Sequence, residues 1–481
     1  MGTRVLPDNL PRPKDEAKLA QMVLKAMTEF GEFIRAQPFQ IETISVYRPE
    51  PSGASYQSLS RPKLNDAILA YQSERMKLPA VKELTDYLWE HGGHPMTITR
   101  DDRDPDQEDW ASLAFHQIIA EPLWRLWHEY SVRSLSSTGA WDPWEVPERA
   151  LEMTAREIAS IEVGNGASVI VTVPLLQLEI DNTAEYEVES GVTLCTWTQE
   201  DRAVYLDRNG CYYPFDDFFG PYNSNCYVKI VANYKEVFRN DENQFRKLQQ
   251  ALEDFVGTIM ARVKWAIMQA TASTPLICEL PATVEIRHNT WAPYPVRRQG
   301  IRRRLNGLIR LDVAGCQSMK KLLSMFGSAS KKFPDLRDVI WMFDRATLAA
   351  LPRDILLEST VGLERLLVDG SGDISRRFRT YGAALIADKD PKTISKKLGE
   401  IYNLRSKAAH GGDENPSRFE SLSVAACAYL AGAIANVVRL VSASKIRSLK
   451  NDERINKAIE RYLVSFVYTG AQEDLDHASK C

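Results

Sequence analysis

The sequence predicts a multidomain α+β protein with a helical N-terminal region, a β-rich central domain and an all-α C-terminal bundle. A chain of 481 residues is long enough for two to four domains. Apolar residues recur at steps of three and four up to about residue 130, give way to β-branched and aromatic runs after about 155, and return to helical spacing after about 336. We therefore expect domains at 1–150, 151–335 and 336–470, with a tail at 471–481.

The same patterns predict the individual elements. In the N-terminal region we expect helices at 14–35, 64–89 and 110–130 and one strand at 41–47. In the centre we expect strands at 158–163, 168–173, 176–180, 192–197, 204–206, 227–231, 276–286 and 308–313, a hairpin turn at Asn209-Gly210 and one long helix at 240–271. In the C-terminal region we expect helices at 339–367 (interrupted near Pro352), 374–386, 392–404, 421–441 and 453–467.

Composition narrows the function classes. The net charge of −4 makes general nucleic-acid binding improbable, so any RNA contact must be local. The seven cysteines are scattered without a C-x-x-C pair, which argues against a zinc ribbon or a disulfide framework and favours a reducing, cytoplasmic location. The longest apolar run, Val424 to Val438, is shorter than the roughly 20 residues of a transmembrane helix, so we expect no membrane association.

The run from Tyr402 to Gly412 combines a guanidinium, a hydroxyl and an imidazole near a predicted helix end. Gly411 and Gly412 tolerate the left-handed backbone that ends helices, so His410 is expected in the last turn of a helix, where the helix dipole favours a positive charge. Arg405 and His410 are five residues apart, roughly 140° around an ideal helix. They can converge on one phosphate if the helix end unwinds or if a second copy of the chain faces the first.

This Arg-x4-His pattern, with the polar Ser406 directly after the arginine, resembles the motif of HEPN domains. The flanking runs 357–367, 372–379 and 401–405 are similar to the Apea-like branch of that family, and the resemblance covers about residues 336–470. It implies a helical bundle that forms a homodimer, with a composite site and no metal or cofactor. Many members are endoribonucleases that act as toxins in bacterial anti-phage defence and abortive infection.

The resemblance assigns roles that suit these residue types. His410 would exchange the proton of a ribose 2′-hydroxyl, since a neutral imidazole can accept a proton near pH 7. Arg405 would stabilise the charge on a pentacoordinate phosphate through parallel hydrogen bonds, and Ser406 would position that phosphate. RNA would be left with a 2′,3′-cyclic phosphate end. Domains 1–150 and 151–335 would restrain the nuclease until a phage-derived trigger or another regulatory partner arrives.

A basic stretch precedes the HEPN-like region. Residues 287–332 hold eleven Lys or Arg residues against the single acid Asp312. The densest part consists of Arg297, Arg298, Arg302, Arg303 and Arg304, shortly after Trp291 and Tyr294. Arginines beside aromatic residues suit phosphate contacts and base stacking, so this stretch is a candidate RNA-binding surface. The alternatives are a solvated basic face or pairing with the acidic segment 101–109.

Three further interpretations stay open. The HEPN-like region can be a non-catalytic module that dimerises and binds RNA or protein, with Arg405 paired to an acid such as Glu400 and His410 as a helix cap. His91 and His94 can ligate zinc, although the glycines between them indicate a solvated turn. The aromatic run 212–222 can stack bases, although a loop packed on the sheet suits it better.

Overall fold

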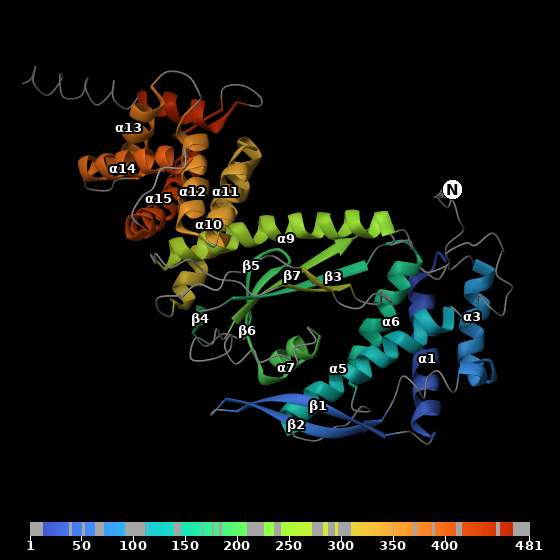
Figure 1. Ribbon diagram of the computed structural model, residues 1–481. Helices are drawn as coiled ribbons and strands as arrows, with labels where there is room; N and C mark the ends of the chain where they lie inside the picture. Colours follow the sequence, from blue (N-terminus) through green and yellow to red (C-terminus); the bar gives the residue numbers. More distant parts are fainter. Residues whose placement is uncertain are drawn as a thin grey trace, which may run out of the picture.

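The computed structural model shows a mostly helical α+β protein with an antiparallel sheet in the middle and a helical region at the C-terminal end (Figure 1). It describes residues 13–37, 41–50, 53–62, 72–91, 111–112, 114–138, 146–165, 167–175, 178–181, 185–208, 226–234, 242–271, 282–286, 294–296, 309–349, 351–368, 373–386, 390–409, 416–448 and 453–464.

The N-terminal helices surround a core of their own. They are α1 (Glu16–Arg35), α3 (Pro79–His91), the π-helical turn η2 (His116–Ala120), α5 (Glu121–Thr138) and α6 (Glu148–Glu162), with the short 3-10 helix η1 (Gln72–Lys77) before α3. Phe30 of α1 meets Phe115 edge to face at 4.8 Å in this core. Asp15 accepts a hydrogen bond from Lys18 N at 2.9 Å and so fixes the start of α1.

Helix α6 occupies a segment for which a strand was predicted, and it spans the predicted domain boundary at residue 150. The expected strand 158–163 was wrong, because residues 158–162 are the last turns of α6. Ala155, Ile158 and Ala159 are buried at helical spacing against the N-terminal core. The β-branched residues of this run therefore pack as the inner face of a helix, and the expected boundary at residue 150 falls inside that helix.

The central sheet has six antiparallel strands in the order β5-β6-β7-β3-β8-β9. The strands are β3 (Ala167–Leu175), β5 (Glu185–Glu189), β6 (Val192–Thr196), β7 (Cys226–Tyr234), β8 (Ala282–Ile286) and β9 (Tyr294–Val296). Elsewhere β4 (Leu178–Ile180) pairs in parallel with β10 (Ile309–Leu311), and β1 (Ile41–Glu50) forms a hairpin with β2 (Gly53–Pro62).

The strand expected at 204–206 was also wrong, because these residues belong to helix α7 (Gln199–Arg208). The hydroxyl of Thr198 accepts a hydrogen bond from Asp201 N at 3.0 Å and donates one to Asp201 Oδ2 at 2.8 Å. This reciprocal cap starts the helix. Val204 then packs against Val132 of α5, which connects α7 to the N-terminal helices.

Two helices connect the sheet to the C-terminal bundle. They are α9 (Glu242–Ala270), which was expected, and α10 (Val313–Lys332), which was not. Asp312 begins α10 by accepting a hydrogen bond from Gly315 N at 2.7 Å. The buried residues Cys316, Met319, Leu323 and Phe326 follow at helical spacing, a pattern that the high charge of this stretch obscured.

The bundle consists of α11 (Leu336–Leu348), α12 (Pro352–Leu367), α13 (Ile374–Ile386), α14 (Pro391–Ala409), α15 (Pro416–Ser442) and a last helix at 455–464. The predicted break at Pro352 is confirmed, since this proline occupies the first turn of α12. Asp335 closes the bundle, because its Oδ2 accepts a hydrogen bond of 2.9 Å from Ile455 N at the start of the last helix. The first and last parts of the bundle are thereby joined.

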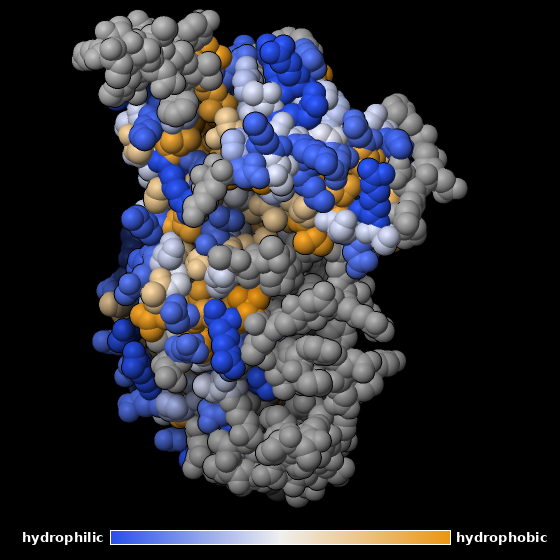
Figure 2. All heavy atoms as spheres, turned by 90° about the vertical axis from the view of Figure 1, so that its left-hand side faces the viewer, coloured by the Kyte–Doolittle hydropathy of each residue, from blue (hydrophilic) through white to orange (hydrophobic). Residues whose placement is uncertain are grey.

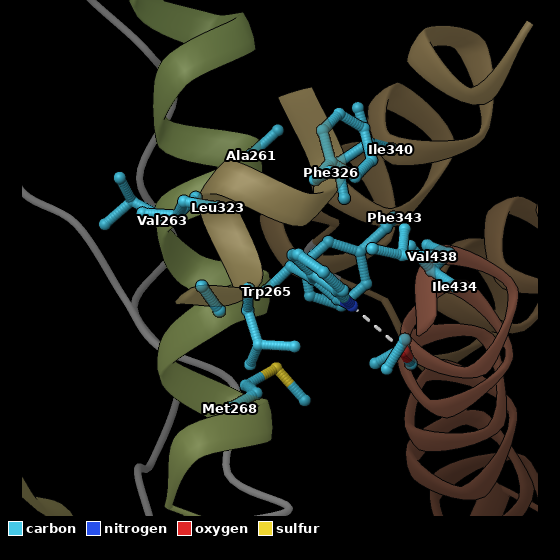
Figure 3. Packing of buried hydrophobic residues seen from close by; sticks show 14 of the residues in the cluster. Ala261, Val263, Trp265, Met268, Leu323, Phe326, Ile340, Phe343, Ile434 and Val438 are labelled. Atoms are coloured by element: carbon cyan, nitrogen blue, oxygen red, sulfur yellow. Dashed lines mark hydrogen bonds between the residues drawn. The ribbon is translucent and has the colours of Figure 1, made fainter. Parts of the chain in front are cut away.

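One hydrophobic core runs from the sheet through α9 and α10 into the bundle. Trp265 of α9 lies fully buried against Phe326 of α10 and donates a hydrogen bond of 2.9 Å to the carbonyl oxygen of Ala431 in α15 (Figure 3). Beside it, Lys264 of α9 forms a buried ion pair with Asp344 of α11. The hydrophobic core is therefore continuous across the domain boundary expected at residue 335.

Among the described helices, Ser417–Ser442 of α15 is long and apolar enough to cross a membrane by length and composition. The helix is longer than the apolar run Val424 to Val438, because it also includes the more polar residues that precede and follow that run. Within the structure its most apolar 18-residue segment is 56% buried. Leu430, Ile434 and Val438 pack in the shared core between α10, α11 and α12.

Candidate functional site

Helix α14 carries the predicted motif and is fixed at both ends. At its start, Asp390 Oδ1 accepts a hydrogen bond from Thr393 N at 3.1 Å, and the bonds from Thr393 lower the pKa of Asp390 from its ordinary value. Along its length, Leu398, Ile401, Leu404 and Ala408 are buried, so one face of the helix is directed inward.

The end of α14 rests on a small hydrophobic cluster that is separate from the main core. Leu356 of α12, Ile401 and Leu404 of α14, and Leu422 and Ala426 of α15 form this cluster. Three helices therefore meet directly beneath the residue pair 405–406. Such packing fixes the direction in which the backbone of α14 presents Arg405.

Arg405 forms an ion pair with Glu364 of α12. The distance from Arg405 Nη2 to Glu364 Oε2 is 3.2 Å, and the two side chains are 30% and 21% exposed. Burial raises the pKa of Glu364 above its ordinary value, although the positive charge of Arg405 opposes this shift. The alternative expectation that Arg405 pairs with an acid is confirmed, but the acid is Glu364 and not Glu400, which lies 3.8 Å from Lys397.

A second guanidinium contacts the end of the same helix. Arg353, in the first turn of α12, donates a hydrogen bond from Nη2 to the carbonyl oxygen of Ala408. The last carbonyl groups of a helix have no partner within the helix and carry partial negative charge, so a cation stabilises them. Arg353 and Arg405 are thus brought to one end of α14, and Arg353 remains exposed to solvent.

The other two predicted catalytic residues have different outcomes. Ser406 lies in the last turns of α14 and is half-buried. His410 directly follows the last residue of α14 and lies outside the described residues. The structure brings Arg405 and Glu364 together and places Arg353 on the carbonyl oxygen of Ala408, three residues after Arg405. The role of His410 stays a prediction.

The basic stretch is described in part. Arg297, Arg298, Arg302, Arg303 and Arg304 lie outside the described residues, as do the acidic segment 101–109 and the aromatic run 212–222. Arg310 pairs with Glu179 at 3.1 Å across the two strands β10 and β4. The lysines 320, 321, 331 and 332 are exposed on α10.

The predicted metal alternative gains nothing from the described residues. His91 is the last residue of α3, stacks on Tyr87 with ring centroids 4.1 Å apart, and places Nδ1 2.9 Å from the carbonyl oxygen of Tyr87. His94 lies outside the described residues. Within the part of the chain that the structure describes, no group of three or more His, Cys, Asp or Glu residues can hold a metal ion.

In comparisons with known proteins, no family model, no curated protein and no solved structure matches the chain. Glu364 and Arg353 were not predicted from the sequence as residues of this site. Glu364 was visible as an acid within the mostly apolar run of α12, but its partner is 41 residues away, and that of Arg353 is 55 residues away.

Proposed function

We propose that this protein is a metal-independent endoribonuclease of the HEPN type, with its site at the C-terminal end of α14. The observation that carries the proposal is the placement of Arg405. Its partly exposed guanidinium is held by Glu364 at a helix end where Arg353 adds a second positive charge, five residues before His410.

The Arg405 guanidinium has five N–H groups, and among the described residues it forms a hydrogen bond with Glu364. The ion pair with Glu364 uses one Nη group, so it orients the planar guanidinium without using all of its N–H donors. The remaining Nη donors suit two oxygens of a phosphate. A pre-oriented cation of this kind stabilises the charge that develops on a pentacoordinate phosphorus.

In the proposed reaction, the ribose 2′-oxygen attacks the adjacent phosphorus and the bond from phosphorus to the 5′-oxygen breaks. The imidazole of His410 accepts the proton of the 2′-hydroxyl, and an imidazolium supplies a proton to the leaving 5′-oxygen. Ser406 contacts the phosphate. The products are a 2′,3′-cyclic phosphate end and a 5′-hydroxyl end. A homodimer, in which a second copy contributes its own pair of residues, completes the site.

The proposed setting is the bacterial cytoplasm, in anti-phage defence or abortive infection. A ribonuclease without restraint is toxic to its own cell, and the core shared by the sheet, α9, α10 and the bundle supports a regulatory connection. Residues 1–335 would then receive a phage-derived trigger or another regulatory partner. Because the core is continuous, a change in the sheet can reach the bundle through α9 and α10.

A second candidate is a non-catalytic module that dimerises and binds RNA or protein. The ion pair between Arg405 and Glu364 favours it, because an arginine paired with a carboxylate also serves to hold two helices together. The two candidates differ in whether the RNA backbone is broken.

The test compares wild-type protein with His410→Ala and Arg405→Lys on structured RNA in the presence of EDTA, with and without lysate from phage-infected cells. Wild type should cleave with the chelator present and leave cyclic phosphate ends, which resist polynucleotide kinase that lacks phosphatase activity. Arg405→Lys should lose most of the activity, because an ammonium group cannot reproduce the planar fork.

Arg365→Lys is the matched control: Arg365 directly follows Glu364, but it lies about 100° around α12 and pairs with Asp338 of α11. It should cleave like wild type. Each variant must unfold like wild type in denaturant before its activity is compared. Absence of cleavage by wild type in all conditions would leave the binding module, and full activity of Arg405→Lys would remove Arg405 from the mechanism.

A further inference from the structure

Helices α13 and α14 form a close antiparallel pair. A Cβ atom added to Gly382 of α13 would lie 2.7 Å from Leu398 Cδ1 of α14, and the rings of Phe378 and Tyr402 are 5.3 Å apart. Positions that come earlier in α13 thus meet positions that come later in α14. The first turn of α13 is therefore directed toward the motif-bearing end of α14.

One side of α14 carries a row of polar and basic residues. Lys392, Lys396, Gly399, Asn403 and Lys407 follow at steps of four, three, four and four, which places them within about 80° of one another around the helix. Both Lys392 and Lys396 are exposed, as are Asn403 and Lys407. From Lys392 to Lys407 the row extends about 22 Å along the helix axis.

Arg379 fills the gap in this row. A Cβ atom at Gly399 would lie 3.0 Å from Arg379 Cδ, so the side chain of Arg379 lies directly over this glycine. Its Nε donates a hydrogen bond of 3.3 Å to the carbonyl oxygen of Ser375 and leaves both Nη groups for other partners. Arg376 is exposed one turn earlier on α13, nearer the end of α14.

Four cations on α13 and α14 form no ion pair within the described part of the chain. The structure shows no ion pair for Arg376, Arg379, Lys392 or Lys396 among the residues it describes. Nearby carboxylates are already engaged: Glu400 pairs with Lys397, while Asp390 and Asp373 accept hydrogen bonds at the starts of α14 and α13. Arg376, Arg379, Lys392 and Lys396 therefore form a strip of cations without ion pairs among the described residues.

We propose that this strip, formed by Arg376, Arg379, Lys392 and Lys396, binds the phosphates of single-stranded RNA and guides the strand to the end of α14. The inference rests on the proposed function and adds the surface that its substrate follows. Cations about one helical turn apart along a straight line suit successive phosphates of an extended strand. The end of the molecule that carries α13 and α14 faces the viewer at the top of Figure 2, where hydrophilic side chains cover much of the surface.

The polar composition of the row on α14 favours single-stranded RNA over a membrane surface as the binding partner. The row on α14 contains no large apolar side chain that would insert into lipid, whereas helices that lie on membranes combine a basic face with an apolar one. Asn403, within the row, can form a hydrogen bond with a base or a ribose hydroxyl.

The test measures binding of the full-length protein to a fluorescent 2′-O-methyl RNA 12-mer, which lacks the attacking hydroxyl and so reports binding without cleavage. The strip variant is Arg379→Gln/Lys392→Gln/Lys396→Gln. Its affinity should fall about tenfold or more. The slope of log K against log salt should become smaller by about 2, because each lost contact to a single strand accounts for about 0.7.

The matched control is Lys14→Gln/Lys82→Gln/Arg149→Gln, which removes the same charge from exposed positions of the N-terminal helical region, outside both the strip and the basic stretch 287–332. It should bind like wild type. Equal affinity of the strip variant and wild type, or an equal loss of affinity in the control variant, would overturn the proposal. So would a strip variant that keeps its RNA affinity and loses binding only to phosphatidylserine vesicles. Because the probe cannot be cleaved, binding is judged separately from catalysis: an RNA-binding strip on a protein without nuclease activity would refute only the proposed reaction.

Discussion

Lys264 Nζ lies 2.7 Å from Asp344 Oδ1, and both side chains are inaccessible to solvent. Lys264 also donates a hydrogen bond of 2.9 Å to Thr347 Oγ1. The pair connects α9, which covers the sheet, to α11, the first helix of the bundle. A charged pair in this position fixes α9 and α11 relative to each other, because any shift along their axes would leave a charge buried without its partner.

Removal of one member of this pair should destabilise the protein strongly. Lys264→Met should lower the free energy of unfolding by about 3–5 kcal/mol, because Asp344 would keep a buried charge without a partner. The double variant Lys264→Met/Asp344→Leu should recover much of the loss. Urea unfolding followed by tryptophan fluorescence measures both, with the exposed Lys320→Gln as the control. A double variant no more stable than the single one would show that the partnerless charge is not the cause.

Gly362 is required where α12 crosses α15. A Cβ atom there would lie 2.8 Å from Leu430 Cδ2, so Gly362→Ala should destabilise by about 1–3 kcal/mol through overpacking. Gly432→Ala is the matched control, because nothing lies within 4 Å of its Cβ position and alanine is favoured within helices by up to about 1 kcal/mol. Thermal or urea unfolding should therefore move the two variants in opposite directions. A stabilised Gly362→Ala would contradict the close crossing.

The carboxyl of Glu364 should make stability depend on pH in a defined direction. Burial raises its pKa above the ordinary value of 4.5 in spite of Arg405, so the folded protein holds this proton more tightly than the unfolded chain does. Its contribution to stability is complete below pH 4.5 and is lost as pH rises through the folded pKa. The stability of wild type relative to Glu364→Gln should thus fall as pH rises above 4.5. A relative stability that rises with pH would mean that attraction to Arg405 outweighs burial.

The described cysteines should be unreactive in the folded protein. Cys195, Cys226, Cys316 and Cys427 are buried and reduced. Burial raises the pKa of Cys195 to about 11, with Glu185 adding to the shift, and burial together with Asp312 raises the pKa of Cys316 to about 11. Iodoacetamide at pH 8 followed by peptide mapping should label these four residues only after denaturation, since the thiolate is the reactive form. Rapid labelling of Cys195 in native protein would show that β6 opens readily.

Elements with long, uniform periodicity were predictable from the sequence. Helix α13 has the predicted ends, and α1, α9, α11, α12, α14 and α15 occur where the apolar spacing indicated. The strands expected at 158–163 and 204–206 failed because a few β-branched residues also fit the inner face of a helix, and capping by Thr198 decided the second case. A window of a few residues does not distinguish the apolar spacing of a helix from that of a strand.

The site was predictable only in its local part. Arg405 could be found because it belongs to a pattern within one helix. Glu364 and Arg353 could not, because their contacts depend on how α12 packs beside α14, and that packing is set by Leu356, Leu404 and other residues of a cluster drawn from three helices. Pairs between distant segments are decided by tertiary structure, which spacing along the chain does not contain.

The hydrogen bond from Ile455 N to Asp335 determines which fragments of the C-terminal bundle can be expressed on their own. A recombinant fragment that starts at residue 336 lacks this acceptor and exposes the apolar sides of α11 and α15 that α9 and α10 normally cover. A fragment that starts before Glu242 retains both. The shortest soluble fragment should therefore begin ahead of α9, well upstream of α11, the first helix of the bundle.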